Sequence, residues 1–194
     1  FGSCKGNHFA QAMRGVTLGL YNMYVQHEYL RESSRLNEEE KAEYRRIVAS
    51  FSEQRTEYVE ISIQKVCELL YKHYGALPII LMDEYDTPLL EAYTDGYWDE
   101  TINTFRQLFH TTFNENDFFY RAIITGVTRI SKNSLFSDLN NLEVDTITCD
   151  AYSDCFGFTE QEVMDAFKCQ DIDTIRDVKA MYDGFTIGRH RDIY

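Results

Sequence analysis

The stretch Pro78-Ile79-Ile80-Leu81-Met82-Asp83-Glu84-Tyr85-Asp86 decides the fold class. Its first five residues are all apolar and do not alternate with polar residues, which is typical of a strand buried on both faces of a parallel sheet. The apolar run stops at Asp83, and Thr87-Pro88 prevents the strand from continuing. We therefore predict a buried parallel strand with acidic residues at its carboxyl end.

A second strand of the same kind is predicted further along the chain. A helix is expected from about Trp98 to Phe113, and the apolar run Arg121–Val127 follows it. Helix, buried strand, helix and buried strand in this order indicate an α/β domain with a parallel sheet. Ligand sites in such sheets lie beyond the carboxyl ends of the strands. Polar residues follow this strand too, namely Thr128, Arg129, Ser131 and Lys132.

Helices are expected on both sides of this core. We predict a helical segment over residues 1–74, an α/β core over 75–150 and a small helical or winged region over 151–194. Helices are expected at Ala10–Leu30, at about Thr56–Tyr74, at Glu160–Phe167 and at Ile172–Tyr182, with a short strand at Glu143–Thr148. A further helix is expected after the first, and its N-cap candidates are Ser33, Ser34 and Asn37. Thr159 and Glu162 have the spacing of a capping box at the start of one of these helices.

Composition limits the classes of function. The chain has 194 residues and is 44% hydrophobic, which is enough for one domain with a core. Its formal net charge of −13 disfavours binding of this segment to nucleic acid. No apolar run approaches the roughly 20 residues that span a bilayer, and no export signal is present, so we expect a cytoplasmic protein without a membrane segment. The five cysteines form no C-x-x-C pair, which argues against a disulfide or zinc scaffold.

An apolar strand followed by Asp-Glu is the pattern of a Walker B element. Asp83, at the tip of a buried strand, could orient a water on Mg²⁺ beside the phosphates of ATP. Glu84 could act as the general base for an attacking water. At the end of the second strand, Thr125 could sense the γ-phosphate, and Arg129 could neutralise phosphate charge.

Each of these residues also has a structural interpretation. The acidic tip could be a solvated turn whose carboxylates cap the next helix, which suits Asp86 well. Thr125 could be an ordinary β-branched strand residue, and Arg129 an exposed or salt-bridged arginine. A metal-dependent nuclease centre built on Asp83, Glu84 and Asp86 is disfavoured, because such centres usually need a lysine close to the carboxylates. No G-x-x-x-x-G-K-[ST] loop occurs in the sequence, so these residues hold at most half of a nucleotide site.

Several ordered blocks of the sequence resemble the bacterial AAA-ATPase-like domain family. The likeness begins at Leu77–Leu90 and is dense from about Gly75 to Tyr194. Its further blocks are Gly96–Glu100, Thr125–Lys132, Ser134–Leu142, Tyr152–Asp154, Phe156–Glu160 and Met181–Phe185. So many blocks in one order are far more specific than the Asp-Glu pair.

The resemblance implies a partial P-loop NTPase-like parallel sheet with flanking helices, whose phosphate loop lies upstream of Phe1. It assigns the magnesium role to Asp83, the catalytic base to Glu84 and the sensor position to Thr125, with Arg129 as a less specific match. In this family the domain usually precedes one that resembles PD-(D/E)xK nucleases, which is the implied partner. The expected function is binding, and in the intact protein hydrolysis, of Mg²⁺-ATP. The alternative is a protein-interaction scaffold with a degenerate nucleotide site.

Overall fold

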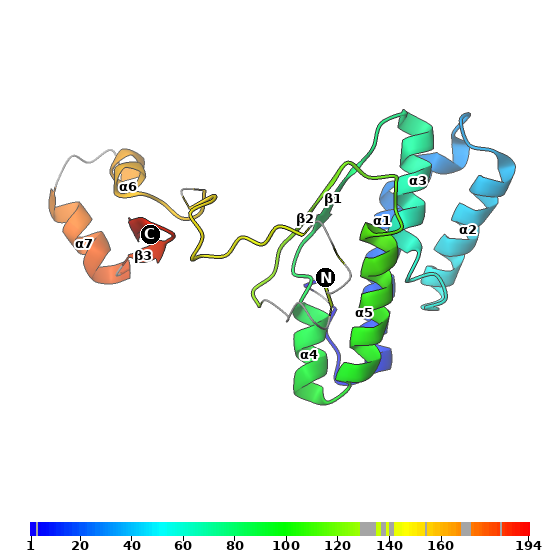
Figure 1. The fold of residues 1–194 in the computed structure, drawn as a ribbon, viewed down its shortest axis with the longest axis horizontal. Helices are drawn as coiled ribbons and strands as arrows, with labels where there is room; N and C mark the ends of the chain where they lie inside the picture. The colour runs from blue at the N-terminus through cyan, green and yellow to red at the C-terminus, as the bar shows by residue number, and fades with distance from the viewer. Residues whose placement is uncertain are drawn as a thin grey trace. The chain divides into compact units, whose positions relative to one another are not determined.

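The computed structural model describes residues 1–2, 4–128, 135–136, 139, 142–153, 155–167, 172–182 and 184–194 (Figure 1). The chain separates into two compact units, residues 1–140 and 141–194, and each is described by itself. Within the described ranges it is a mixed α/β protein with seven α-helices and a small parallel sheet. The division at residues 74 and 150 that the sequence suggests stays a prediction.

The first part of unit 1 is helical, as predicted. It consists of α1 (Phe9–Gln26), the 3-10 helix η1 (Glu28–Glu32), α2 (Glu38–Ser52) and α3 (Ser62–Tyr74). The core between these helices is aromatic, and the Tyr24 hydroxyl donates to the carbonyl oxygen of Ser62 at 2.8 Å, far along the chain. Two predicted bounds were wrong, because α1 ends before His27 and α3 begins at Ser62 rather than at Thr56.

Charged side chains link α2 to α3 at the edge of this core. Lys72 on α3 contacts Glu40 on α2 at 2.7 Å and Glu68 on its own helix at 2.6 Å. Lys65 contacts Glu43 on α2 at 3.4 Å. At the start of α2, Asn37 and Glu40 form a complete capping box. Glu40 therefore serves both the cap of α2 and the contact between the two helices.

The sheet of unit 1 has two parallel strands, β1 (Ile79–Met82) and β2 (Arg121–Ile124). Between them the chain forms α4 (Thr87–Asp95) and α5 (Trp98–Phe113), which lie side by side. The parallel pair and α5 were predicted, whereas α4 was not. The same Thr87-Pro88 that stops β1 occupies the first turn of α4, where a proline costs no helical hydrogen bond.

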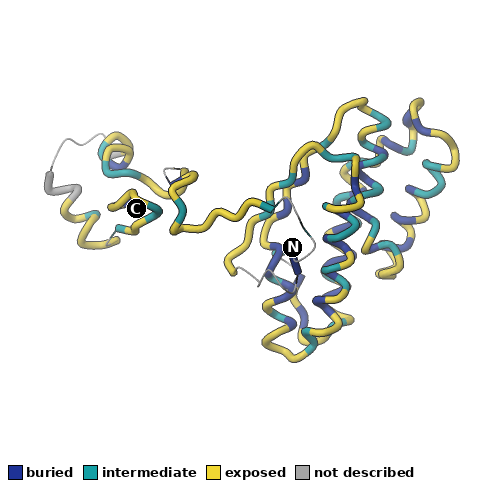
Figure 2. The backbone as a smooth tube through the Cα atoms, viewed as in Figure 1, coloured by how far each residue is buried: buried dark blue, intermediate teal, exposed yellow. Residues whose placement is uncertain are grey.

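The prediction that β1 is buried on both faces is wrong in this chain. Ile80 and Met82 are buried, but Ile79 is 57% exposed and Leu81 is 75% exposed. Figure 2 shows the burial class along the backbone. Ile123 on β2 is also half exposed. One face of the parallel pair thus packs on the core, while the other presents aliphatic side chains that are at least half exposed.

Unit 2 contains two helices and a hairpin. These are α6 (Glu160–Phe167), α7 (Ile172–Tyr182), and the antiparallel strands β3 (Phe185–Ile187) and β4 (His190–Ile193). Both helices were predicted, and Thr159 and Glu162 exchange the hydrogen bonds of the predicted capping box. The strand predicted at Glu143–Thr148 was wrong, because this segment makes a turn closed by the bond from Cys149 N to Thr146 O at 2.9 Å.

Among the described helices, none is both long and apolar enough to cross a membrane.

Candidate functional site

The carboxyl ends of β1 and β2 bring Asp83 and Thr125 together. The last register pair is Met82 with Ile124, so the next residue of each strand also lies opposite the other. The Thr125 hydroxyl donates a short hydrogen bond to Asp83 Oδ1. The backbone continues the ladder through Thr125 N to Met82 O at 2.9 Å. Two residues 42 positions apart in sequence, both predicted as site residues, thus form one polar pair, and both are exposed.

Glu84 lies next to this pair, and its carboxylate packs against Gly2. Its backbone N–H donates to Asp83 Oδ1 at 3.0 Å, and its φ of 50° places it in the left-handed region, which is uncommon for a residue with a side chain. Its carboxylate packs against Gly2, where an added Cβ would lie 1.6 Å from Glu84 Oε2. The left-handed turn therefore gives the two neighbouring carboxylates different surroundings.

The first residues of the chain form part of the wall of this site. The backbone nitrogen of Phe1 donates to the carbonyl oxygen of Asp83 at 2.9 Å. The Phe1 ring packs edge to face on Phe105 of α5, with ring centroids 5.4 Å apart. Gly2 leaves room for the Glu84 carboxylate. Sequence reasoning missed this contact, because nothing in the N-terminal residues themselves indicates what they pack against.

Asp86 is not a solvated cap, which corrects the alternative drawn from the sequence. Its side chain is only 1% exposed and, although it precedes α4, makes no hydrogen bond to that helix. Instead Asp86 Oδ2 accepts the backbone N–H of Thr128 at 2.5 Å. The Tyr85 hydroxyl donates to the carbonyl oxygen of the same Thr128 at 2.9 Å. The acidic turn is therefore attached to the segment that follows β2.

The strand ends offer one carboxylate and one hydroxyl to a cation, not a set of three carboxylates. Asp83 presents a carboxylate and Thr125 a hydroxyl at an exposed strand end, and hard cations such as Mg²⁺ prefer oxygen ligands and keep several waters. Asp86 is buried in a different hydrogen bond, so it does not join Asp83 and Glu84 in a three-carboxylate centre. Over the part of the chain that the structure describes, no three His, Cys, Asp or Glu side chains form a group that could hold a metal ion.

The remaining predicted site residue, Arg129, lies outside the described residues. Tyr85, Asp86 and Gly126 were missed as site residues. Only Gly126 carried a signal, because it lies inside the apolar run Arg121–Val127 and a glycine within such a run often marks the close approach of another segment. An added Cβ there would meet Tyr85 Cε1 at 2.6 Å and Asp86 Oδ1 at 2.7 Å.

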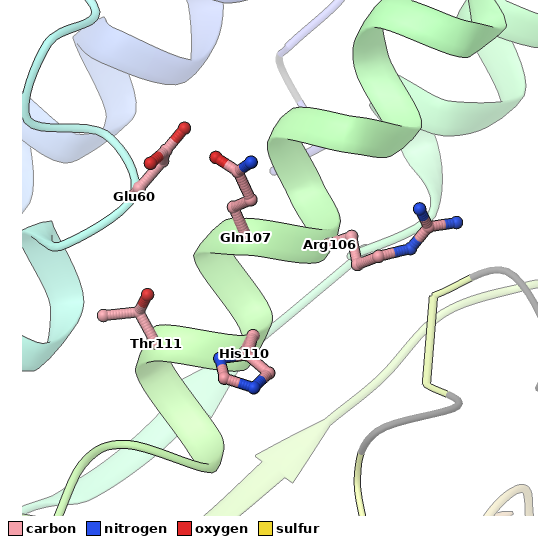
Figure 3. Close-up of a pocket in the computed structure, with 5 residues that line it drawn as sticks. All are labelled: Glu60, Arg106, Gln107, His110 and Thr111. Carbon is pink, nitrogen blue, oxygen red and sulfur yellow. The ribbon is translucent and has the colours of Figure 1, made fainter.

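A separate pocket of about 370 Å³ lies on α5 and holds none of the predicted site residues (Figure 3). It is lined by Glu60, Arg106, Gln107, His110 and Thr111. Glu60 and Gln107 point toward each other, and the Gln107 amide nitrogen, when turned to Glu60, donates to Glu60 Oε2 at 2.9 Å. Arg106 points to the other side of the helix. The residues that line the pocket are of polar type, and the Glu60 carboxylate and the Gln107 amide are hydrogen-bonded to each other.

Comparison with known proteins finds a matching family model and a curated relative. A family model described as "Predicted AAA-ATPase" matches residues 18–136, which include both strands and the Asp83–Thr125 pair. A curated relative is the "Uncharacterized protein in vnfD 5'region" of Azotobacter chroococcum mcd 1, which is 35% identical over 114 residues. The match covers 57% of this chain but 22% of the relative, so this chain spans about a fifth of that protein. No solved structure matches. Because the family model covers well over half of the chain, the chain belongs to the predicted AAA-ATPase family.

Proposed function

We propose that this chain is part of an ATP-binding domain of the P-loop NTPase type, in which Mg²⁺-ATP is held beyond the carboxyl ends of β1 and β2. The observation that carries the proposal is the hydrogen bond from the Thr125 hydroxyl to Asp83 Oδ1. It joins an acidic and a hydroxyl side chain where ligands of parallel α/β sheets bind. Membership of the family supports nucleotide use in general.

Each residue of the strand ends has a distinct role in this proposal. Asp83 would hold Mg²⁺ through a water, because its carboxylate is exposed and anchored at one oxygen by the Thr125 hydroxyl and the Glu84 N–H. Glu84 would accept a proton from an attacking water once its carboxylate moves off Gly2. Thr125 would respond to the γ-phosphate by exchanging its hydrogen bond to Asp83. Arg129 is proposed from the sequence alone to neutralise phosphate charge.

Part of the phosphate-binding apparatus must come from elsewhere. The 194 residues contain no G-x-x-x-x-G-K-[ST] segment, so we propose that an upstream loop of a longer polypeptide cradles the phosphates. The chain matches only about a fifth of its Azotobacter relative, which leaves ample length for such a loop. A nuclease-like domain after Tyr194 is a further proposal. Because this segment carries a net charge of −13, nucleic acid would be bound there and not here.

The test is thermal unfolding with and without Mg²⁺-ATP, on this chain and on a version extended upstream through the expected loop. Ligand that binds only the folded state stabilises it by roughly 2.7 kcal/mol at a hundredfold excess over Kd. We expect the extended version to show a Mg²⁺-ATP shift that Asp83→Asn removes. The control is Asp117→Asn, an exposed aspartate in the loop before β2, which should leave the shift unchanged.

Two results would contradict the proposal. If Mg²⁺-ATP still raises the unfolding midpoint of the Asp83→Asn variant, the nucleotide binds at another site. No shift in either version, with both folded, would favour the scaffold alternative. That alternative has one structural observation in its support, because Tyr29 and Tyr74 in the helical half are 41% and 58% exposed and pack on each other edge to face. Its test is then a search for a protein partner of this helical surface.

A further inference from the structure

The carboxylate of Asp86 is buried and has its hydrogen-bond partner on a different segment of the chain. The residue is 1% exposed, and a charged side chain removed from water must be hydrogen-bonded to be tolerated. Oδ2 accepts the backbone N–H of Thr128 at 2.5 Å, a charge-assisted bond across 42 positions of sequence. The proposed Mg²⁺ chemistry does not use this carboxylate, so its burial needs another explanation.

The sequence around Asp86 directs this carboxylate away from its own helix. An aspartate that precedes a helix ordinarily accepts the N–H of the second or third helical residue. In α4 the second residue is Pro88, which has no N–H, and the N–H of Leu89 donates to the backbone oxygen of Asp86 at 3.0 Å. The carboxylate makes no bond to α4 and is left for Thr128.

Tyr85 binds the other backbone polar group of the same residue, Thr128. Its hydroxyl donates to the carbonyl oxygen of Thr128 at 2.9 Å, and its backbone N–H donates to Thr125 O at 3.1 Å. The ring itself is fixed, because it is 7% exposed and packs on Phe109 and Phe136 with centroids 6.3 and 5.3 Å away. Both polar groups of the Thr128 backbone are thus bound by consecutive residues of the acidic turn.

Gly126 makes this close approach possible. A Cβ at this position would lie 2.6 Å from Tyr85 Cε1 and 2.7 Å from Asp86 Oδ1, distances that real Cβ atoms essentially never show. The two side chains therefore occupy the space that any other residue would fill. We call Tyr85, Asp86 and the Gly126–Thr128 backbone that they bind the clamp.

We infer that Tyr85 and Asp86 are positioning residues, which through the clamp hold β2 in register with β1 and so keep the Thr125 hydroxyl on Asp83. The inference rests on the proposed function, because the pair that is positioned is the proposed Mg²⁺-ATP site. Neither side chain needs to touch nucleotide. The clamp would instead fix the geometry of the ligand oxygens, and small displacements of such oxygens weaken a Mg²⁺ site, which demands near-ideal geometry.

The first measurement requires no nucleotide and uses this chain. We expect the Thr128 amide to exchange slowly in the wild type and about tenfold or more faster in Tyr85→Phe and Asp86→Ala, which each remove one hydrogen bond of the clamp. The matched control is Tyr93→Phe on α4, which makes the same chemical change at a side chain that is 75% exposed. Equal Thr128 exchange in all four proteins would overturn the clamp.

The second measurement is the factor by which Mg²⁺ raises ATP affinity, in the full-length polypeptide encoded by the gene. Tyr85→Phe and Asp86→Ala should reduce this factor about tenfold while ATP affinity without Mg²⁺ stays within about twofold of the wild type. A general loss of structure would lower both affinities. Asp86→Asn keeps a side-chain oxygen that can accept the Thr128 N–H, so it should restore much of the Mg²⁺ effect. Because Tyr85→Phe removes only a hydroxyl group, this variant alone can test the inference if Asp86→Ala does not fold.

The outcomes separate this inference from the function on which it rests. A wild type that binds ATP in a Mg²⁺-dependent way, with clamp variants that do the same to an equal extent, would overturn the positioning role and leave the proposed function intact. A full-length wild type that does not bind ATP under either condition would overturn the proposed function itself. If Mg²⁺ no longer raises ATP affinity in Tyr85→Phe and Asp86→Ala but does so again in Asp86→Asn, the positioning role and the proposed function are both supported.

Discussion

At the scale of single residues, the candidate site could be predicted only where a local rule applies. Asp83 and Thr125 each end an apolar run, and the rule that parallel strands place their carboxyl ends together is enough to pair them. Asp86 follows by only three positions, yet its burial depends on a loop 42 residues away. Sequence patterns carry no information about such a partner, so the same letters were consistent with a solvated cap.

The two glycines Gly126 and Gly19 should respond in opposite directions to replacement by alanine. At Gly126 the new methyl group would overlap Tyr85 and Asp86, so we expect a loss of about 1–3 kcal/mol in the free energy of unfolding. Gly19 lies inside α1 with nothing within 4 Å of an added Cβ, so Gly19→Ala should stabilise by about 0.5–1 kcal/mol. Urea unfolding of both variants checks this. A neutral Gly126→Ala would mean that the clamp is looser than described.

At the scale of elements, apolar periodicity found most helices and both strands of the parallel pair, but it placed their ends less well. The helix α4 was missed because Thr87-Pro88 was interpreted only as the end of a strand, although proline also begins helices. The Glu143–Thr148 segment has the β-branched composition of a strand, but no strand in the described part of the chain pairs with it, and its last residues form a turn. Propensity is a weak guide where no partner supplies the ladder.

The contact between α2 and α3 should make stability depend on acidic pH. The hydrogen bond from Lys72 lowers the pKa of Glu40 in the folded protein. Burial raises the pKa of Glu68, but the hydrogen bonds from Lys72 and Lys65 lower it by more than burial raises it. The pKa of Glu68 therefore also lies below its ordinary value. Because both folded pKa values lie below the unfolded ones, this stabilisation is present above the ordinary value of 4.5. It is lost as the pH falls through the folded values.

The variant Lys72→Gln tests this dependence. It removes the donor to both carboxylates, so the urea midpoint should fall less between about pH 7 and about pH 3.5 than it does in the wild type. The control Lys41→Gln removes an ion pair within α2 and none between helices. If the urea midpoint falls by the same amount between the two pH values in Lys72→Gln and in the wild type, other carboxylates cause the pH dependence.

At the scale of the whole molecule, the sequence pattern overstated the burial of the sheet in this chain. A run such as Pro78–Met82 is typical of a strand enclosed on both sides, yet Leu81 is 75% exposed. The chain spans about a fifth of its Azotobacter relative. In the proposed P-loop domain, further strands and helices of a longer polypeptide would cover this aliphatic face. Such a cover would explain why the run is apolar throughout although Leu81 is exposed in this chain.

Leu81→Thr should therefore have different effects in the two forms of the protein. In this chain the side chain is exposed, so the free energy of unfolding should change by less than about 0.5 kcal/mol. In the full-length polypeptide a covered Leu81 would lose buried apolar area, at a cost of about 1–3 kcal/mol. Ile80→Thr, on the buried face, should destabilise both forms. Denaturant unfolding of both variants in both forms, each compared with its own wild type, is the measurement. An equally small effect of Leu81→Thr in both forms would show that this face is not covered in the full-length polypeptide.

The left-handed backbone at Glu84 has a consequence for how this position can evolve. A side chain in that conformation costs roughly 1–2 kcal/mol that glycine would not incur. Selection for thermal stability alone would therefore favour glycine or asparagine at codon 84, whereas selection for a proton acceptor would retain glutamate. The two pressures act in opposite directions on one codon. The residue that natural populations hold there thus records which pressure has been stronger, independently of any assay on the purified protein.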